Sequence, residues 1–400
     1  MNQSSKFTQI AIISYDFIED SKNSRPLMVY ETLKEGTYPM DVVVYCANFS
    51  HHKKQFVEFY NRDFQAVRVP HYSRNISLMR IFSYWIFCAK IIFKQDLKNT
   101  QLIYFCVPPN ELAIVALLYK FLWKKTVILD VVDLWPEAFP LPRLINPGVK
   151  FFFYLTARPI RNWLFSQADL VISQSAYFKS KLALPFSKCK VVLMGTTHPI
   201  DNRFRNFHRS SLQDCLYILY LGSINAINDL KSLISILVEL QPFRKVHLSV
   251  IGGGKRLNYL KETLESLQIS SEFYGICFDH KIKDQEFKRC HFGYNGYVPS
   301  TEVAISYKSL EYLAHGLPLL NSTKGDTAQL VEKTGCGFNF QHQDWTNLLT
   351  GILELTDESY FAMQQRSLTA FEENFSWNVF RNNLTDALHS LEQKTPAKRF

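Results

Sequence analysis

The side chains best suited to chemistry lie between Ser306 and Pro318, in the run Ser-Tyr-Lys-Ser-Leu-Glu-Tyr-Leu-Ala-His-Gly-Leu-Pro. Ser306 is a good N-cap, and Gly316 followed by proline stops a helix, so the run predicts one short helix. Lys308 and Glu311 are three residues apart and share a face of that helix. A cation in the first turn suits a diphosphate, and a carboxylate one turn later suits a diol such as ribose. The alternative is a surface helix with an i,i+3 ion pair.

Three loops that follow predicted strands combine glycine with small polar residues. They contain Gly222 and Ser223; Gly252, Gly253 and Gly254; and Thr323, Gly325, Asp326 and Thr327. A glycine in such a loop lets a phosphate approach backbone N–H groups, although Gly222 also fits an ordinary strand-to-helix turn. The second loop lacks the full G-x-G-x-x-G pattern, so we expect tight backbone packing there. In the third loop, Asp326 or Thr327 can also cap the next helix.

A second candidate site follows a predicted strand in the first half, in the run Asp130-Val-Val-Asp-Leu-Trp-Pro-Glu137. Asp133 falls at the carboxyl end of that strand, where a catalytic or acceptor-contacting carboxylate belongs. We take Asp133 as a catalytic candidate and Trp135 and Glu137 as candidates for acceptor contact. The alternative is that Asp133 only caps a loop.

Several chemistries have no motif in this sequence. There is no D-x-D to hold a metal–diphosphate, no G-x-S-x-G nucleophile elbow and no P-loop. The adjacent His51 and His52 point in different directions on regular backbone, so they do not form a metal site. The eight cysteines show no zinc spacing and fall mostly in apolar runs, which favours a reducing cytosol. We therefore expect neither a metal nor a resident cofactor.

The composition narrows the choice of partners. The 400 residues carry a formal charge of +9 and are 14% aromatic. A basic, aromatic-rich chain can meet nucleic acid, an anionic membrane or phosphorylated substrates, but no nucleic-acid motif stands out. Residues 80–94 and 150–165 mix cations with aromatics, as helices at a lipid surface do, although core helices can be equally apolar. The N-terminus lacks a signal-peptide h-region, and no apolar run is long enough to span a bilayer.

Apolar strand-like stretches alternate with helix-like stretches along the chain. In the first half we expect strands at 10–14, 42–46, 102–106, 127–129, 170–173 and 191–193, and helices at 26–34, 77–94, 110–123, 148–165 and 175–184. In the second half we expect strands at 216–221, 246–251, 273–274, 292–294, 319–321 and 337–340, and helices at 229–239, 256–267, 285–289, 307–315, 327–333 and from 345 to 391. This alternation indicates parallel sheets covered on both faces.

The predicted fold class is therefore α/β, with two doubly wound Rossmann-like domains facing a central cleft. The first domain spans 1–200 and the second 215–375, and the aperiodic residues 195–214 are interpreted as the linker. Ligands in such sheets bind beyond the carboxyl ends of the strands, and here we expect them in the cleft.

The order of these motifs resembles a known family. The Gly222 loop, the triple-glycine loop, Lys308-Ser-Leu-Glu311-Tyr-Leu-Ala-His-Gly-Leu-Pro318 and Lys324-Gly-Asp-Thr327 are similar to those of retaining, nucleotide-sugar-dependent glycosyltransferases of the GT-B fold, family 4. Asp133-Leu-Trp-Pro-Glu137 resembles the same run in members that assemble bacterial capsule and exopolysaccharide. The likeness covers most of residues 216–340 and the first half loosely.

The resemblance implies an acceptor-binding first domain, a donor-binding second domain and a final helix, 376–400, that crosses back to the first. It implies a metal-independent hexosyl- or deoxyhexosyltransferase that acts with retention on a lipid-linked saccharide. We expect it in the cytoplasm, at the inner face of the cell membrane, beside other polysaccharide-assembly enzymes. Lys308 would stabilise the leaving diphosphate and Glu311 would contact the donor ribose. The implied donor-binding set is Gly222, Ser223, Gly253, Lys308, Glu311, Thr323, Gly325, Asp326 and Thr327.

The sequence departs from the family pattern at three places. The first glutamate of the family's E-x7-E motif is replaced by Val303, the basic pair that follows the first glycine loop by Ser223 and Asn228, and a histidine near Asp133 by Val132. These departures leave open a non-catalytic partner that binds or stabilises another transferase. A nucleotide-sugar epimerase is a third alternative, but it lacks a convincing acid/base pair.

Overall fold

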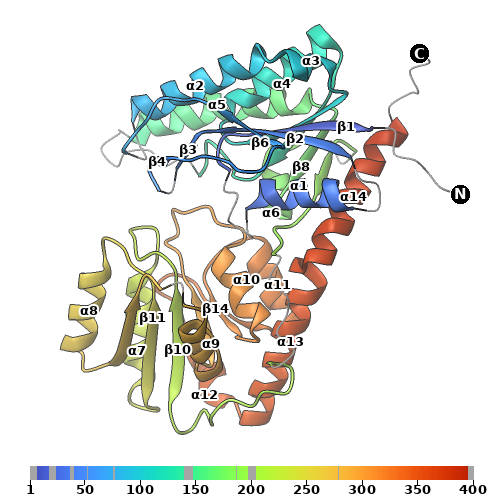
Figure 1. Ribbon diagram of the computed structural model, residues 1–400. Helices are drawn as coiled ribbons and strands as arrows, with labels where there is room; N and C mark the ends of the chain where they lie inside the picture. The colour runs from blue at the N-terminus through green and yellow to red at the C-terminus, as the bar shows by residue number, and fades with distance from the viewer. Residues whose placement is uncertain are drawn as a thin grey trace, which may run out of the picture. The chain divides into compact units, whose positions relative to one another are not determined.

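The computed structural model describes residues 7–17, 24–36, 40–51, 53–74, 77–138, 147–185, 187–196, 204–277 and 279–394. Within helices, the side chains of residues 147, 149–152 and 394 lie outside this description. The chain divides into two compact units, residues 1–197 with 378–400 and residues 198–377 (Figure 1). We call these the first unit and the second unit.

A parallel sheet forms the centre of the first unit. Its described strands are β1 (Gln9–Ser14), β2 (Asp41–Ala47), β5 (Phe64–Val67), β6 (Leu102–Val107), β7 (Thr126–Val131), β8 (Leu170–Ser173) and β9 (Cys189–Val191). They lie in the order β5-β2-β1-β6-β7-β8-β9, and β3 (Phe49–Ser50) pairs separately with β4 (Gln55–Phe56). Most strand residues are buried, as apolar strands covered on both faces should be.

Helices cover both faces of this sheet. They are α1 (Arg25–Glu35), α2 (Leu78–Ile92), α3 (Gln95–Asn99), α4 (Glu111–Trp123), α5 (Pro147–Ser166) and α6 (Ala176–Leu182). Figure 1 shows α2, α4 and α5 side by side on one face and α1 on the other. The closing helix α14 (Trp377–Lys394) also joins this unit, where the Arg25 guanidinium lies 5.5 Å from the ring centroid of Phe380.

The second unit repeats the plan. Its described strands are β10 (Leu216–Leu221), β11 (Val246–Ile251), β12 (Ser270–Gly275), β13 (Phe292–Asn295), β14 (Leu319–Asn321) and β15 (Gly337–Asn339), in the order β12-β11-β10-β13-β14-β15. Its helices are α7 (Leu230–Leu240), α8 (Leu257–Ser266), α9 (His280–Arg289), α10 (Tyr307–Ala314), α11 (Asp326–Thr334), α12 (Thr346–Glu354) and α13 (Asp357–Phe375). Every strand pair in the sheet is parallel. The predicted α/β class with doubly wound units is confirmed.

Some predicted elements differ in detail. The strand expected at 191–193 is β9, two residues earlier, and the short elements β3, β4, β5 and α3 were not predicted. Residues 204–214 of the expected linker pack on the second unit, where Arg209 donates to the carbonyls of Phe287 and His315, both at 2.9 Å. All eight cysteines are free thiols. None of the described helices is long and apolar enough to cross a bilayer.

Candidate functional site

The strand order locates a binding edge in each unit. In the second unit the chain builds β10, β11 and β12 outward and then returns to place β13 on the other side of β10. Such a reversal opens a crevice at the carboxyl ends of the two central strands, where open α/β sheets bind ligands. The residues that follow β10 and β13 are therefore the first candidates for a site.

Lys308 lies at this reversal point. It occupies the first turn of α10, whose N-cap Ser306 accepts a hydrogen bond from the Ser309 amide. Its Nζ lies 5.1 Å from the ring centroid of Tyr220, on β10, and 4.4 Å from that of Tyr297, just after β13. The predicted helix is confirmed, and it brings the lysine to the edge where a ligand is expected.

The ammonium of Lys308 is buried and unpaired. The residue is only 8% exposed, and its Nζ has no hydrogen-bond partner within the described parts of the chain. Burial lowers the pKa of Lys308 to about 7. Two aromatic faces attract a cation but do not replace the hydrogen bonds that it loses on burial. The site is thus built for an anion that supplies those bonds.

The first two glycine loops follow β10 and β11, and Tyr220, the neighbour of Lys308 on β10, lies two residues before Gly222. Gly222 has a φ of 107°, and a Cβ built on it would meet nothing within 4 Å, so its backbone faces open space. A Cβ on Gly252 would lie 1.8 Å from the carbonyl oxygen of Gly222, and one on Gly254 would lie 2.4 Å from that of Ile224. The tight packing predicted for the triple-glycine loop is confirmed at these two positions. Gly253 itself lies against Ile276.

A ladder of asparagines fixes the helix that carries Lys308. Asn295, Asn321 and Asn339 end three neighbouring strands in register. The Asn295 amide donates to Asn321 Oδ1 and the Asn321 amide to Asn339 Oδ1, both at 2.8 Å. The Ser306 hydroxyl donates to Asn295 Oδ1 at 2.7 Å. This chain of hydrogen bonds, buried at Asn295 and Asn321, ties the N-cap of α10 to the sheet.

Glu311 lies one turn after Lys308 on α10 and is held by another helix. Its carboxylate pairs with the ammonium of Lys283, on α9. It lines a pocket of about 360 Å³ with His280, Lys281, Lys283, Asp284, Phe287 and His315. The alternative of a surface helix with an i,i+3 ion pair is wrong, because Lys308 is buried and Glu311 pairs with another helix. Lys283 was missed, since it precedes Glu311 by 28 residues.

The third loop is anchored through its threonines. The Thr323 hydroxyl donates to Asn321 Oδ1 at 2.7 Å, and the Thr327 hydroxyl donates to the Ala304 carbonyl at 2.8 Å. Helix α11 begins at Asp326, with Gly325 at the N-cap and no side-chain cap. The prediction that Asp326 or Thr327 caps this helix is therefore wrong. Thr323 and Gly325 line a second pocket, of about 660 Å³.

In the first unit, Asp133 follows β7 as predicted. Its Oδ1 accepts a hydrogen bond from the Leu134 amide at 2.9 Å. Burial raises the pKa of Asp133 to about 6, and hydrogen bonds from Leu134 and the Trp135 side chain, together with the charge of Arg80, offset part of that rise. A carboxylate with this pKa is suited to accept a proton near neutral pH.

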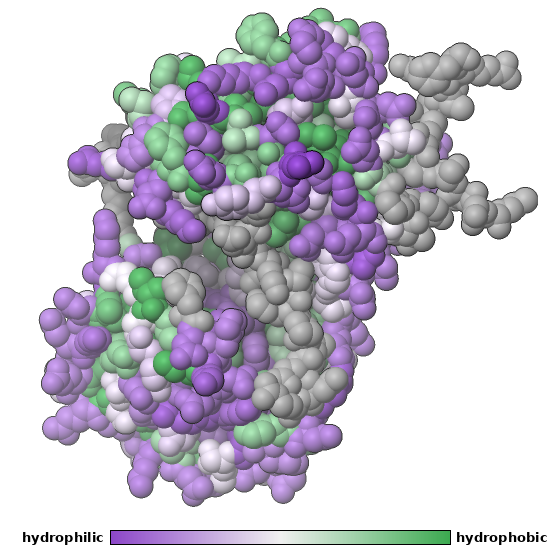
Figure 2. Space-filling model, viewed as in Figure 1, coloured by the Kyte–Doolittle hydropathy of each residue, from purple (hydrophilic) through white to green (hydrophobic). Residues whose placement is uncertain are grey.

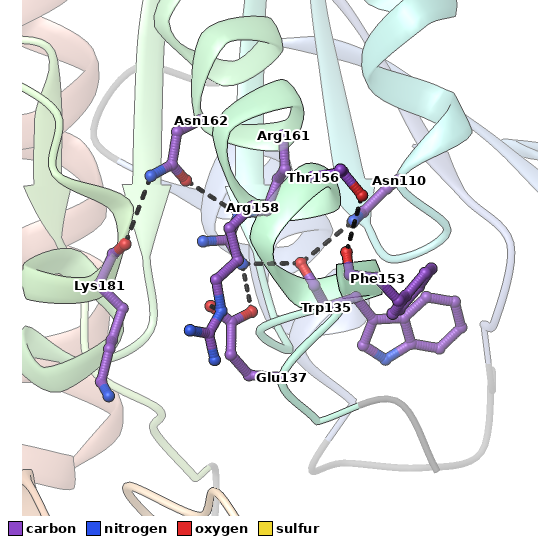
Figure 3. A network of polar contacts seen from close by, with 9 residues as sticks. All are labelled: Asn110, Trp135, Glu137, Phe153, Thr156, Arg158, Arg161, Asn162 and Lys181. Carbon is purple, nitrogen blue, oxygen red and sulfur yellow. Dashed lines mark hydrogen bonds and ion pairs between the residues drawn. The ribbon is translucent and has the colours of Figure 1, made fainter. Parts of the chain in front are cut away.

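Glu137 anchors the loop that carries Trp135. Its carboxylate lies 3.0 Å from Arg158 Nε and 2.5 Å from an Arg161 nitrogen, which also donates to the Trp135 carbonyl at 2.8 Å. Asn110 donates to the same carbonyl at 3.2 Å. Figure 3 shows the Trp135 indole pointing away from this group. Both oxygens of Glu137 are engaged in ion pairs, one with the buried Arg161 and one with the half-exposed Arg158, whereas the indole of Trp135 lies outside them.

The structure therefore gathers the predicted residues into separate groups. Lys308 lies beside Tyr220, which precedes Gly222 and Ser223 and donates to the Ser223 carbonyl at 2.7 Å. Asp133 and Trp135 lie in the first unit. Tyr220, Tyr297 and the asparagine ladder were missed by sequence reasoning. The one available signal was that each asparagine lies at the end of a predicted strand or within one residue of that end.

Comparison with known proteins identifies the second unit. Residues 215–358 match the family described as "Glycosyl transferases group 1". This stretch is a glycosyltransferase group 1 domain. The match includes β10, the glycine loops, Lys308 and Glu311. No curated protein sequence matches the chain significantly.

Solved structures show that the whole chain has the GT-B fold. Sucrose-phosphate synthase from Thermosynechococcus elongatus superposes with a TM-score of 0.72 at 14% identity, over 97% of this chain and 100% of that one. HepE of Anabaena, in complex with UDP and glucose, superposes with a TM-score of 0.63 at 15% identity, over 96% of this chain and 100% of that one. The lipopolysaccharide outer core galactosyltransferase WaaB superposes with a TM-score of 0.64 at 13% identity, over 96% of this chain and 99% of that one.

Proposed function

We propose that this protein transfers a sugar, with retention, from a nucleoside diphosphate sugar to a lipid-linked saccharide. The second unit binds the donor and the first unit binds the acceptor. The setting is the assembly of a bacterial capsule, exopolysaccharide or related glycan, with other assembly enzymes as partners. The group 1 domain and the UDP-bound fold relative support the donor class.

One observation carries this proposal, the buried and unpartnered ammonium of Lys308 at the reversal point of the second sheet. The diphosphate of the donor would accept its hydrogen bonds, and the backbone at Gly222, next to Ser223, leaves room for the phosphates. Glu311 would hold the ribose hydroxyls in the pocket that it shares with Lys283. Ser306 and the asparagine ladder would keep Lys308 in place.

The chemistry required of the protein is stabilisation of the leaving diphosphate. As the bond to the sugar breaks, negative charge grows on the phosphate oxygens near Lys308, and a preorganised contact of this kind contributes roughly 3–4 kcal/mol. No metal ion has a part in this scheme. In the first unit, Asp133 would accept the proton of the attacking hydroxyl, and Trp135 would offer an apolar face to the acceptor sugar.

Donor binding and turnover test the proposal. A panel of nucleoside diphosphates and their sugars is scanned for thermal shift and then titrated by calorimetry against wild type and Lys308→Ala. Loss of one charged hydrogen bond should weaken donor binding by about 1.5–3 kcal/mol, which is about 10- to 150-fold. Nucleotide release that depends on a lipid-linked acceptor completes the test. Absence of any nucleotide binding by wild type would refute the proposal.

An exposed apolar face on the first unit supports a membrane-bound acceptor and a peripheral position at the cytoplasmic face of the membrane. The exposed side chains follow helical spacing on three adjacent helices: Leu78, Phe82, Trp85 and Phe93 on or at the end of α2; Ile114, Phe121 and Leu122 on α4; and Phe153, Ile160 and Trp163 on α5. Phe93 is 78% and Trp163 62% exposed. Figure 2 shows hydrophobic side chains mixed with hydrophilic ones over this part of the molecule. Aromatics interleaved with lysines suit an anionic bilayer.

Sedimentation with lipid vesicles tests this surface. The triple change Phe82→Ser, Trp85→Ser, Trp163→Ser should reduce binding to vesicles that contain anionic lipid by at least about tenfold, because three exposed aromatics that would enter the bilayer are lost. Phe243→Ser is the matched control, because Phe243 is 69% exposed but belongs to the second unit. Equal sedimentation of both variants would rule out the face as a docking surface.

Val303 favours one second candidate, a non-catalytic member that binds the donor and stabilises another transferase. Turnover by the isolated protein would end this alternative, whereas co-purification with an active transferase and no turnover alone would favour it.

A further inference from the structure

Cations and aromatic rings gather at the carboxyl edge of the first sheet. The cluster consists of Lys54, Tyr72, Arg80, Tyr84 and Trp135, and we call it the Arg80 cluster. Its members come from loops after β3 and β5, from α2 and from the loop after β7. Tyr15, which directly follows β1, packs edge-on against Tyr84 with ring centroids 4.4 Å apart. In the first sheet, the order in which the chain adds strands reverses between β1 and β6. The cluster therefore adjoins the edge where a ligand is expected.

Arg80 is the centre of this cluster. Its guanidinium carbon lies 5.3 Å from the ring centroids of both Tyr84 and Trp135, and its Nε donates to the Tyr84 hydroxyl at 2.5 Å. Tyr84 and Trp135 are themselves in contact, with centroids 6.2 Å apart. A guanidinium that is already fixed between two aromatic faces loses little further conformational freedom when it binds a ligand.

Lys54 supplies a second cation beside Arg80. Its Nζ lies 5.0 Å from the centroid of Tyr72 and 3.3 Å from His51 Nδ1. Burial and the charge of Arg80 lower the pKa of Lys54, while Asp16 opposes them. The backbone of Lys54 has a φ of 56°, a conformation that costs a non-glycine residue roughly 1–2 kcal/mol. Two cations therefore lie near one another at this edge, and one stands on strained backbone of the kind that clusters at ligand-binding positions.

We infer that Arg80 and Lys54 bind an anionic group of the acceptor, while Trp135 packs against the adjoining sugar. This inference rests on the proposed function and names the acceptor class, an anionic glycan substrate. The anion is either the phosphate or diphosphate that joins a saccharide to its lipid or the carboxylate of an acidic sugar. Asp133, whose carboxylate is within electrostatic reach of Arg80, then lies beside the bound saccharide.

The position of Arg80 on α2 favours the phosphate source. The same helix turns Leu78, Phe82 and Trp85 outward to solvent and Tyr84 inward. If the outward stripe rests on a bilayer, the cations on the inner side meet the headgroup end of a lipid carrier. A polyprenyl-linked diphosphate would present both charges at that depth.

Calorimetric titration with three small probes tests the inference. The probes are geranyl diphosphate, methyl glucuronide and the neutral methyl glucoside. They are titrated into the Lys308→Met protein, so that the diphosphate site of the second unit does not contribute. Arg80→Gln and Lys54→Gln are then introduced into that protein. Lys98→Gln is the matched control, because the Lys98 ammonium lies over Trp123 at 5.1 Å, a similar cation–aromatic pair elsewhere in the first unit.

Each glutamine change should weaken binding of one anionic probe by about tenfold or more, as expected for a charge-assisted hydrogen bond. Arg80→Lys should retain part of the affinity, which separates loss of charge from loss of folding. The glucoside should bind more weakly than that anionic probe, and its affinity should change little in the glutamine variants. Lys98→Gln should leave the affinity of every probe unchanged. An effect confined to geranyl diphosphate assigns a phosphate, and one confined to the glucuronide assigns an acidic sugar.

Equal binding of the glucoside, no binding of either anion, or no effect of Arg80→Gln would overturn the inference. Failure of this inference is distinguishable from failure of the proposed function. Donor affinity of the single variant Arg80→Gln, with Lys308 intact, is measured separately and should match that of wild type.

Discussion

The charge of Lys308 makes donor binding depend on pH. Burial lowers its pKa to about 7, so the amine of the empty site is half protonated near neutrality. The diphosphate of a nucleotide sugar stays fully ionised across this range and binds the ammonium form. With a pKa of about 7, the protonated fraction falls from about 0.9 at pH 6 to about 0.03 at pH 8.5. The apparent Kd should therefore rise about 30-fold over that interval.

Calorimetry in buffers of different ionisation enthalpy measures both the affinity and the proton taken up. Wild type should take up close to one proton for each donor bound above about pH 8. Lys308→Arg keeps its charge and should give a flat profile, and Lys308→Met should bind weakly at every pH. A flat profile in wild type, or an equal slope in Lys308→Met, would refute the assignment.

The same burial predicts an opposite effect on stability. The folded protein binds fewer protons than the unfolded chain between about pH 7 and the ordinary lysine pKa of about 10.5, so the free energy of unfolding rises with pH in that window. Lys308→Met lacks this dependence. Its stability advantage over wild type should therefore shrink by about 2–3 kcal/mol between pH 6 and pH 9. Urea unfolding at the two pH values measures this, and an unchanged difference would contradict it.

Three further changes test other parts of the account. Because burial raises the pKa of Asp133 in the free protein to about 6, kcat/KM should rise through that pH and then level, and Asp133→Asn should lower kcat about 100- to 10,000-fold; an active variant would exclude Asp133 as the base. Asp130→Ala strands the buried Arg25 guanidinium, 2.8 Å from Asp130, and should cost about 3–5 kcal/mol in urea unfolding. Asp63→Ala breaks the more exposed ion pair between Lys34 and Asp63 and should cost less than about 1 kcal/mol; equal costs of the two changes would refute the comparison. Asn321→Ala should lower stability by about 1–3 kcal/mol and weaken donor binding; an unchanged Kd would mean that the ladder does not position α10.

Hydrophobic periodicity was enough to predict the architecture. Continuous apolar strands such as β6 and β11 are buried on both faces, and that pattern is visible in the sequence. The short elements β3 and β4 carry no such pattern, because their pairing depends on contacts with the rest of the fold. β5 has two exposed central residues at the sheet edge, so its apolar signal is weak.

The candidate site was predicted only in part. Spacing and caps gave the helix of Lys308, but charged residues usually lie at the surface, so the burial of this lysine could not be read from the sequence. Its aromatic neighbours are Tyr220 on β10 and Tyr297 just after β13, and these two strands become adjacent only in the folded sheet. For the same reason, register aligns the three asparagines, and Lys283 reaches Glu311 from another helix.

A crystal structure of the complex with a nucleoside diphosphate tests the central claim most directly. The account predicts that Nζ of Lys308 lies about 3 Å from a phosphate oxygen and that the ribose hydroxyls contact Glu311. A nucleotide bound elsewhere, with the ammonium still enclosed between Tyr220 and Tyr297, would contradict it.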